Sequence, residues 1–135
     1  MDFRVKILRV SGIKKKIDDL ERLFNKTRDT LKENGFDILS PIQREEEASL
    51  AYLKIVFMSK KGINTNWLNN LATQFGVYLT VHFLDYGEMK EYFYIFSPKN
   101  KVIDELILDF ELDGFGNAIF SEDSPSRTDK LYLFR

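Results

Sequence analysis

The fold is decided by VYLTVHFL at residues 77–84 and EYFYIF at residues 91–96, two runs in which β-branched and aromatic residues dominate. Such residues favour extended strands, because their side chains pack well on a pleated surface. The polar segment between the two runs contains Gly87 and has the composition of a turn. The pattern therefore predicts a central β-hairpin over residues 77–96.

Two further strands are predicted upstream of the hairpin. Residues 3–10 alternate with a period of two, and this alternation places Phe3, Val5 and Ile7 on the predicted core face. Residues 50–58 alternate in the same way, and their predicted core positions are Ala51, Leu53, Ile55 and Phe57. Both segments are therefore expected to be strands with one face against the core.

Two helices are predicted between these strands. Ile17, Leu20, Phe24 and Leu31 recur at helical spacing, and the pattern ends at Gly35, a residue that suits a left-handed helix stop. A second helix is expected after Asn64 or Thr65, which can cap its first turn. Its apolar side is formed by Trp67, Leu68, Leu71 and Phe75, and Gly76 is the expected stop. Trp67 is interpreted as a core anchor.

The remaining segments have weaker patterns. Residues 37–49 contain Pro41 and three consecutive glutamates, which predicts a loop or a short irregular strand. Residues 102–113 fit two alternatives, because their apolar residues alternate as in a strand and also match a helix begun by Ser97 and Pro98. We prefer the strand. The aromatic residues of the last segment, 130–135, are expected to tie the tail to the sheet.

The predicted order of elements indicates the fold class. A strand–helix–strand–helix–hairpin order predicts an α+β protein with an antiparallel or mixed sheet and two helices packed on one face. This is a ferredoxin-like sandwich with a C-terminal strand extension. A chain of 135 residues buries one sizeable core, so a single domain over residues 1–135 is expected, with a core at 1–97 and an extension at 98–135.

Two groups of segments carry a resemblance to a known family. One group comprises residues 53–57, 67–71, 75–76, 79–83 and 86–88, which resemble the second half of the family, and the other comprises residues 5–12 with the helix through Phe24, which resemble its first strand and helix. Their apolar positions resemble those of the YubB-like ferredoxin-like family of plasmid and phage proteins. The resemblance implies a ferredoxin-like fold and an origin in a mobile element.

Composition excludes several classes of site. The chain has no cysteine, so disulfides, thiolate metal ligands and cysteine nucleophiles are absent. No apolar run approaches the roughly 18 residues that a membrane span requires, and the first residues enter a strand pattern directly. A cytoplasmic protein is therefore expected.

The sequence predicts no catalytic centre, metal site or cofactor. His82 is the only histidine, it lies in a strand, and no serine is held near it by spacing. Asp109, Glu111 and Asp113 share one face of the predicted strand, but successive same-face residues lie about 7 Å apart, which is too far to share one ion. Neither a dinucleotide-binding glycine pattern nor a phosphate-binding loop occurs. We therefore expect a non-enzymatic protein.

Charge is distributed unevenly along the chain. Residues 1–61 have 14 basic and 10 acidic residues, a net charge of +4, and residues 62–135 have 6 basic and 11 acidic residues, a net charge of −5. Such polarity steers association. The sequence therefore predicts an acidic C-terminal surface that binds or inhibits a basic protein partner, such as the nucleic-acid-handling machine of a defence complex. The predicted partner-binding residues are Asp104, Glu105, Asp109, Glu111, Asp113, Glu122 and Asp123.

Two alternatives remain open. The first is a single-stranded nucleic-acid-binding module, in which basic and aromatic residues share an open sheet face and contact phosphates and bases. Its predicted residues are Arg4, Lys6, Tyr52, Lys54, Tyr78, His82, Tyr92 and Tyr94. The second alternative is a structural homodimeric subunit that associates through a sheet edge or an apolar face.

Overall fold

The computed structural model of the chain describes residues 4–99 and 104–127. Its strands are β1 (Val5–Ile13), β2 (Phe36–Ile38), β3 (Gln43–Glu47), β4 (Leu50–Ser59), β5 (Tyr78–Asp85), β6 (Lys90–Phe96), β7 (Asp104–Leu112) and β8 (Ala118–Phe120). Its helices are α1 (Lys14–Lys26), α2 (Arg28–Glu33) and α3 (Thr65–Phe75), and a 3₁₀ turn, η1, covers Pro125–Arg127.

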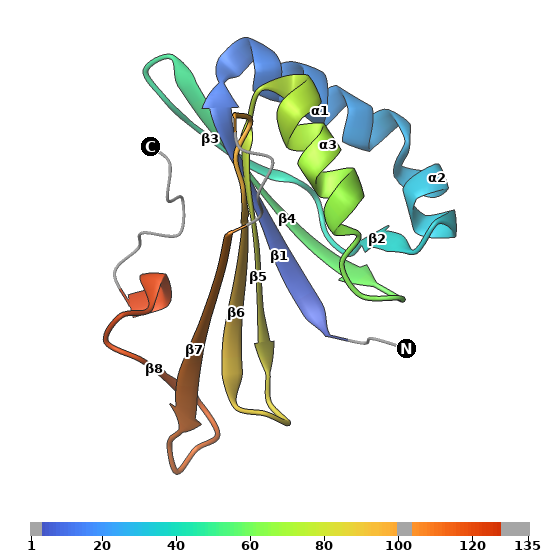
Figure 1. The fold of residues 1–135 in the computed structure, drawn as a ribbon. Helices are drawn as coiled ribbons and strands as arrows, with labels where there is room; N and C mark the ends of the chain where they lie inside the picture. Colours follow the sequence, from blue (N-terminus) through green and yellow to red (C-terminus); the bar gives the residue numbers. More distant parts are fainter. Residues whose placement is uncertain (1–3, 100–103, 128–135) are drawn as a thin grey trace.

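The strands form one sheet in the order β2-β4-β1-β5-β6-β7-β8, and β3 pairs with the same strand, β4, as β2 does. Every pairing between these strands is antiparallel. The sheet curls into an open half-barrel, and Figure 1 shows α1 and α3 side by side over one end of it. We call the face under these helices the helix side and the other face the open face.

The predicted ferredoxin-like sandwich is wrong. Its short sheet with a two-helix layer is replaced by an eight-stranded antiparallel sheet on which the helices are small. The physical reason is that β1 pairs antiparallel with both β4 and β5, while β2, β3, β7 and β8 extend the sheet beyond these central strands. Helices over one end cannot cover so wide a sheet, and curling brings its distant strands closer together.

The core lies between the helices and the central strands. Its buried residues are Leu8, Val10, Leu53, Ile55, Leu79 and Val81 from the sheet and Ile17, Leu20, Phe24, Leu68 and Leu71 from the helices. The core positions predicted for residues 50–58 are confirmed, because Ala51, Leu53, Ile55 and Phe57 are all buried.

The predicted faces of the first strand are wrong. Leu8 and Val10 lie on the helix side, whereas the side chain of Val5, which was expected in the core, is 53% exposed. Ile7 lies on the open face with Val5, and Phe3 lies outside the described residues. The pattern misled because the polar residues Lys6 and Arg9 are themselves buried in this strand.

The predicted helices are largely confirmed. The Asn64 side chain accepts a hydrogen bond of 3.1 Å from the amide of Trp67, and Gly76 ends α3 in the left-handed conformation with φ of 64°. The first helix is divided into α1 and α2 at Thr27, whose hydroxyl donates to the carbonyl of Leu23 at 2.7 Å. Such a bond competes with the regular helical pattern and favours a break at this residue.

Two uncertain segments prove to be strands. Residues 36–38 and 43–47 form β2 and β3, both paired with β4, where a loop or a short irregular strand was expected. Residues 104–112 form β7, so the preference for a strand over a helix is confirmed in the described part of residues 102–113. The tail at 130–135 lies outside the described residues.

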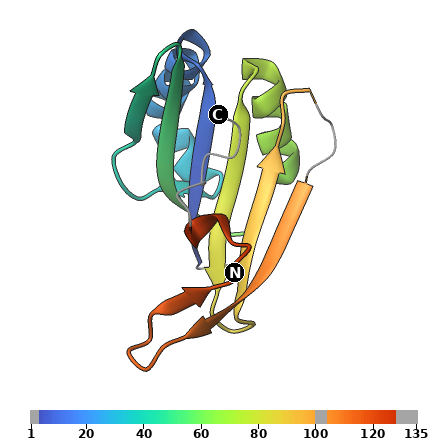
Figure 2. The same cartoon turned by 90° about the vertical axis from the view of Figure 1, so that its left-hand side faces the viewer.

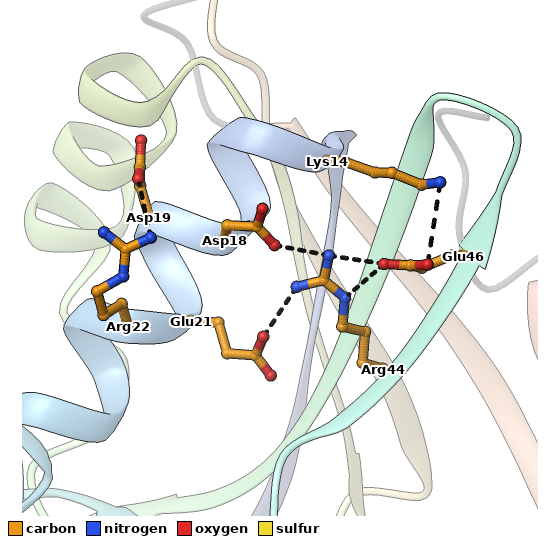
Figure 3. Close-up of polar contacts among 7 residues, drawn as sticks. All are labelled: Lys14, Asp18, Asp19, Glu21, Arg22, Arg44 and Glu46. Carbon is orange, nitrogen blue, oxygen red and sulfur yellow. Dashed lines mark hydrogen bonds and ion pairs between the residues drawn. The ribbon is translucent and has the colours of Figure 1, made fainter.

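A network of ion pairs joins β3 to α1 (Figure 3). The Arg44 guanidinium lies 2.7 Å from a carboxylate oxygen of Asp18, 2.9 Å from one of Glu21 and 2.9 Å from one of Glu46. Partial burial lowers the pKa of Arg44, but hydrogen bonds to the three carboxylates outweigh it and hold the pKa above its usual value. The network therefore fixes the edge strand β3 against the helix layer.

Replacing Arg44 with methionine is expected to lower the free energy of unfolding by about 1–2 kcal/mol. Charge-assisted hydrogen bonds in a network stabilise a fold more than isolated surface ion pairs do. Arg44→Lys should lose about half as much, since lysine keeps the charge without the planar fork. Urea unfolding at low and high salt measures both effects. An Arg44→Met variant as stable as the wild type would show that the network adds nothing.

Within the described residues, no helix combines the length and the apolar character needed to cross a membrane.

Candidate functional site

The C-terminal strands carry a large excess of acidic residues. We call residues 104–127, which comprise β7, β8 and η1, the acidic arm. It has seven acidic residues and one basic residue, a net charge of −6. Figures 1 and 2 show the β7–β8 hairpin at the end of the sheet remote from α1 and α3. The arm therefore presents its carboxylates where the helix layer does not reach.

The structure places six of the seven predicted acidic residues on the surface of the arm, namely Asp104, Glu105, Asp109, Glu111, Glu122 and Asp123. Asp109 forms an ion pair with Lys90 of the neighbouring strand. Asp113 is half-buried and is used inside the turn that joins β7 to β8. Asp113 therefore shapes the arm, and the other six residues supply its exposed charge.

The turn at the end of the arm is closed by hydrogen bonds. We call residues 113–117 the tip. Asp113 Oδ1 accepts from the amides of Phe115 at 2.8 Å and Asn117 at 2.9 Å, and the Asp113 amide donates to the Asn117 carbonyl at 2.9 Å. The amides of Asn117 and Phe115 hold the pKa of Asp113 below its usual range. Gly116 has a φ of 82°, which a residue with a side chain adopts only with strain.

This ordered tip displays an aromatic side chain to solvent. Phe115 is 92% exposed, more than any other large apolar residue in the described chain. Leu112 and Ile119 are also exposed on the arm, between the carboxylates. The pairing of β7 with β8 places Ile119 on the same face as Glu111 and Leu112 on the other face of the hairpin. Aromatic residues are enriched in protein-interaction surfaces, so the exposed Phe115 ring is the candidate contact. Sequence reasoning missed Phe115, although the segment Asp-Gly-Phe-Gly-Asn has the composition of a turn.

The base of the arm is fixed to the open face by a buried carboxylate. Glu91 is fully buried, and its two oxygens accept hydrogen bonds from Ser124 Oγ at 2.5 Å and Ser126 Oγ at 2.6 Å. The ring nitrogen Nε2 of His82 lies 2.8 Å from Glu91 Oε2. We call Glu91, His82, Ser124 and Ser126 the latch. It fixes η1 in front of the strands, as Figure 2 shows.

The contacts of the latch indicate which ring nitrogen of a neutral His82 carries the proton. Arg9 Nη1 lies 3.4 Å from Nδ1 of His82, and because a guanidinium can only donate, Nδ1 accepts and Nε2 carries the proton given to Glu91. Burial alone raises the pKa of Glu91, but the hydrogen bonds from His82 and the two serines outweigh it, so the pKa lies below its ordinary value. Glu91 is therefore held ionised.

The latch does not have the order of a catalytic triad. In a triad the imidazole lies between the nucleophile and the carboxylate, whereas here Glu91 lies between Ser124 and His82. The Ser124 hydroxyl donates directly to the Glu91 carboxylate, with no imidazole between the two groups. Among residues 4–99 and 104–127, no group of three or more potential ligands could hold a metal ion.

The predicted nucleic-acid-binding residues are divided between two faces. The strand pairing places Tyr52, Lys54, Tyr78 and His82 on the open face, and Lys6, Tyr92 and Tyr94 on the helix side. Arg4 also lies on the helix side, with its guanidinium 4.5 Å from the Phe83 ring centroid. Of these residues, Lys6, Tyr52 and His82 are buried. The structure therefore does not bring the set together on one exposed surface.

Comparisons with known proteins find no relative for the chain. No family model matches it. Searches of curated proteins and of solved structures also return no match. The resemblance to YubB-like proteins stays a sequence-based prediction, and the chain's function is argued from its own residues.

Proposed function

We propose that the chain is a small non-enzymatic binding protein whose acidic arm binds a basic protein partner. The observation that carries this proposal is the tip, where an ordered turn displays Phe115 at the end of an arm that has six exposed acidic residues. An exposed aromatic side chain supplies apolar area for a central contact, and the surrounding charge supplies steering and orientation. The arm thus combines the two features that a protein-binding surface needs.

The chemistry of the arm favours a partner that handles nucleic acid. Carboxylates on a projecting strand can occupy basic sites that otherwise bind phosphate, since both groups accept hydrogen bonds from arginine and lysine. In this proposal the protein is a mobile-element product that inhibits such a machine, for example one used in defence. The net charge of −6 over 24 residues of the arm supports this choice of partner.

The order of the arm also supports binding. The hydrogen bonds of the tip and the latch fix its two ends before any partner arrives, which reduces the entropy lost on association. Preorganisation of this kind favours a site that recognises a folded surface. The proposal therefore depends on exposed carboxylates, and their replacement tests it.

A variant carrying Glu105→Gln, Glu111→Gln and Glu122→Gln is expected to lose partner binding by about tenfold or more, because several steering charges are removed together. Its melting temperature should change little, since all three side chains are exposed. Binding is measured by nuclease-treated pull-down from a lysate with stepwise salt elution. Asp29→Asn, Glu33→Gln and Glu45→Gln together make the same charge change elsewhere and should bind as the wild type does.

Two results would contradict the proposal. In the first, the arm variant captures as much protein partner as the wild type. In the second, nucleic acid dominates the eluate before nuclease treatment and no protein survives the treatment, which would favour the nucleic-acid-binding alternative.

A further inference from the structure

A second surface of the protein has the opposite character to the arm. A cavity of about 360 Å³ opens between α2, α3 and the ends of β2 and β4. Its walls are aromatic: the ring centroids of Phe36 and Phe57 lie 4.3 Å apart in a stacked arrangement, and the Trp67 ring meets Phe36 edge-on at 5.1 Å. Leu31 and Ile63 complete the apolar lining. We call this cavity the aromatic pocket.

Three exposed lysines lie close in the chain to residues that line the aromatic pocket. The Lys60 amide donates to the carbonyl of Gly35, a lining residue, at 3.2 Å, and the Gly35 amide donates to the carbonyl of Lys32 at 3.1 Å. Lys61 follows Lys60 in the chain, and all three lysine side chains are exposed. Glu33 is the acidic residue beside them. The three lysines and Glu33 together have a net charge of +2, beside a cavity whose aromatic and aliphatic lining also includes Asn34, Ser59 and Asn64.

The tip of the acidic arm is compatible with this pocket in size and opposite to the neighbouring lysines in charge. Phe115 is a single exposed ring with acidic residues at positions 111 and 113, and a cavity of roughly 150 Å³ already holds benzene. The pocket lies at the β2–β4 edge of the sheet and the arm at the β7–β8 edge. Figure 1 shows the β7–β8 hairpin at the end of the sheet remote from α3, which lines the pocket, so the tip does not lie in the pocket of its own chain.

We propose that the tip of the arm docks into the aromatic pocket of a second copy of this chain. Phe115 enters the pocket, and the carboxylates beside it face Lys32, Lys60 and Lys61 of the other copy. The contact joins two different surfaces, so it is heterologous and leaves one tip and one pocket unused at the ends of each pair. This inference rests on the proposed function, because it uses the arm as the binding element.

Sedimentation velocity tests the docking with purified protein. Over roughly a hundredfold concentration series at low salt, the mean mass of the wild type is expected to rise above the monomer value of 15.9 kDa, and high salt should reduce the rise. Phe115→Ala should remain a monomer throughout the series. A Lys60→Glu, Lys61→Glu variant should also remain a monomer, because its added carboxylates repel the tip.

Mixing the two variants gives the sharpest outcome. Phe115→Ala retains a pocket and the lysine variant retains a tip, so a mixture is expected to form one-to-one dimers and no larger species. Lys15→Glu with Lys16→Glu on α1 makes the same charge change away from the pocket and should associate as the wild type does. Circular dichroism confirms that each variant is folded.

Two results would overturn the inference: a wild type that stays monomeric throughout the series, or association that survives Phe115→Ala. If the inference fails while the Glu105, Glu111 and Glu122 variant still loses a lysate partner, the arm binds another protein and the proposed function stands. If that variant also loses no partner, both fail.

Discussion

Replacing Glu91 with alanine is expected to lower the free energy of unfolding by about 3–5 kcal/mol. The substitution removes a buried carboxylate and leaves its hydrogen-bond donors without an acceptor. His82, Ser124 and Ser126 would each lose a hydrogen-bond acceptor in a buried setting. The base of the acidic arm should then detach from the open face. Urea unfolding measures the loss of stability, and amide hydrogen exchange over residues 118–127 measures the detachment.

Two variants separate the contributions to the latch. Glu91→Gln keeps the shape of the side chain but removes its charge, so it should cost less than Glu91→Ala. Ser124→Ala removes one donor while the carboxylate keeps its hydrogen bonds from His82 and Ser126. The free energy of unfolding is expected to fall by about 1 kcal/mol. If Glu91→Ala is as stable as Ser124→Ala, the carboxylate does not organise the latch.

The latch also predicts a dependence of stability on pH. The folded protein holds the pKa of Glu91 below its ordinary value of 4.5, so the stabilisation is present above that pH and is lost as the pH falls toward the folded pKa. Glu91 is in contact with the titratable group of His82, which is itself in contact with the Arg9 guanidinium. The acid limb of the stability profile should therefore be shallower in Glu91→Gln than in the wild type. Equal slopes would show that other carboxylates dominate acid unfolding.

The elements that could be predicted from the sequence are those whose local signals agree with their final packing. In α3, the cap at Asn64, the apolar spacing and the stop at Gly76 all point to the same helix. In β4, the alternating residues are apolar on the helix side, and the core contacts only that side. Local propensity and tertiary environment therefore favour the same structure, which is why periodicity was sufficient there.

The first strand could not be assigned because its polar residues are buried. Lys6 is fully buried, with its ammonium 5.4 Å from the centroid of the Phe83 ring and a hydrogen bond to the Arg4 carbonyl. The alternation pattern was interpreted with lysine on the solvent face, so the two faces of the strand were exchanged in the prediction. The aromatic partner of Lys6, Phe83, comes from a distant strand, and no local pattern reveals it.

The ferredoxin-like prediction failed for a related reason. Residues 43–47 have no apolar period because Arg44 of β3 faces the carboxylates of α1 rather than a hydrophobic core. Pairing by such polar strands widens the sheet without leaving a hydrophobic signature. The spacing of apolar residues therefore could not predict the number of strands or the curling of the sheet.

Parts of the candidate site were visible in the sequence and others were not. The excess of acidic residues in the C-terminal half follows from counting charges, and it identified the arm. The latch joins Glu91 to Ser124, which are 33 residues apart, and the aromatic pocket joins Phe36 to Trp67. Long-range pairs of this kind depend on strand order and register, which single-sequence patterns do not determine.

Replacing Phe36 with alanine is expected to lower the free energy of unfolding by about 3–5 kcal/mol, the usual cost of deleting a buried aromatic ring and leaving a cavity. Phe36 stacks on Phe57 and lies at 6.3 Å from the ring centroid of Phe24, so its loss removes the central contact of this aromatic cluster. It is also one of only three residues in β2, whose pairing with β4 should weaken. Urea unfolding measures the loss.

Trp67 reports the same change by fluorescence, because it is the only tryptophan in the chain and its ring contacts Phe36. Its emission should shift to longer wavelength in Phe36→Ala as water reaches the enlarged pocket, whereas Phe36→Leu should cost about 1–2 kcal/mol and shift it less. Phe115→Ala removes an equally large ring from an exposed position and should leave stability within about 0.5 kcal/mol of the wild type. Equal losses from Phe36→Ala and Phe115→Ala would mean that the aromatic cluster does not support the edge of the sheet. A larger loss of stability from Phe36→Ala than from Phe115→Ala would show that the two rings have different roles. Phe36 would then stabilise the fold around the pocket, and Phe115 would be available for binding.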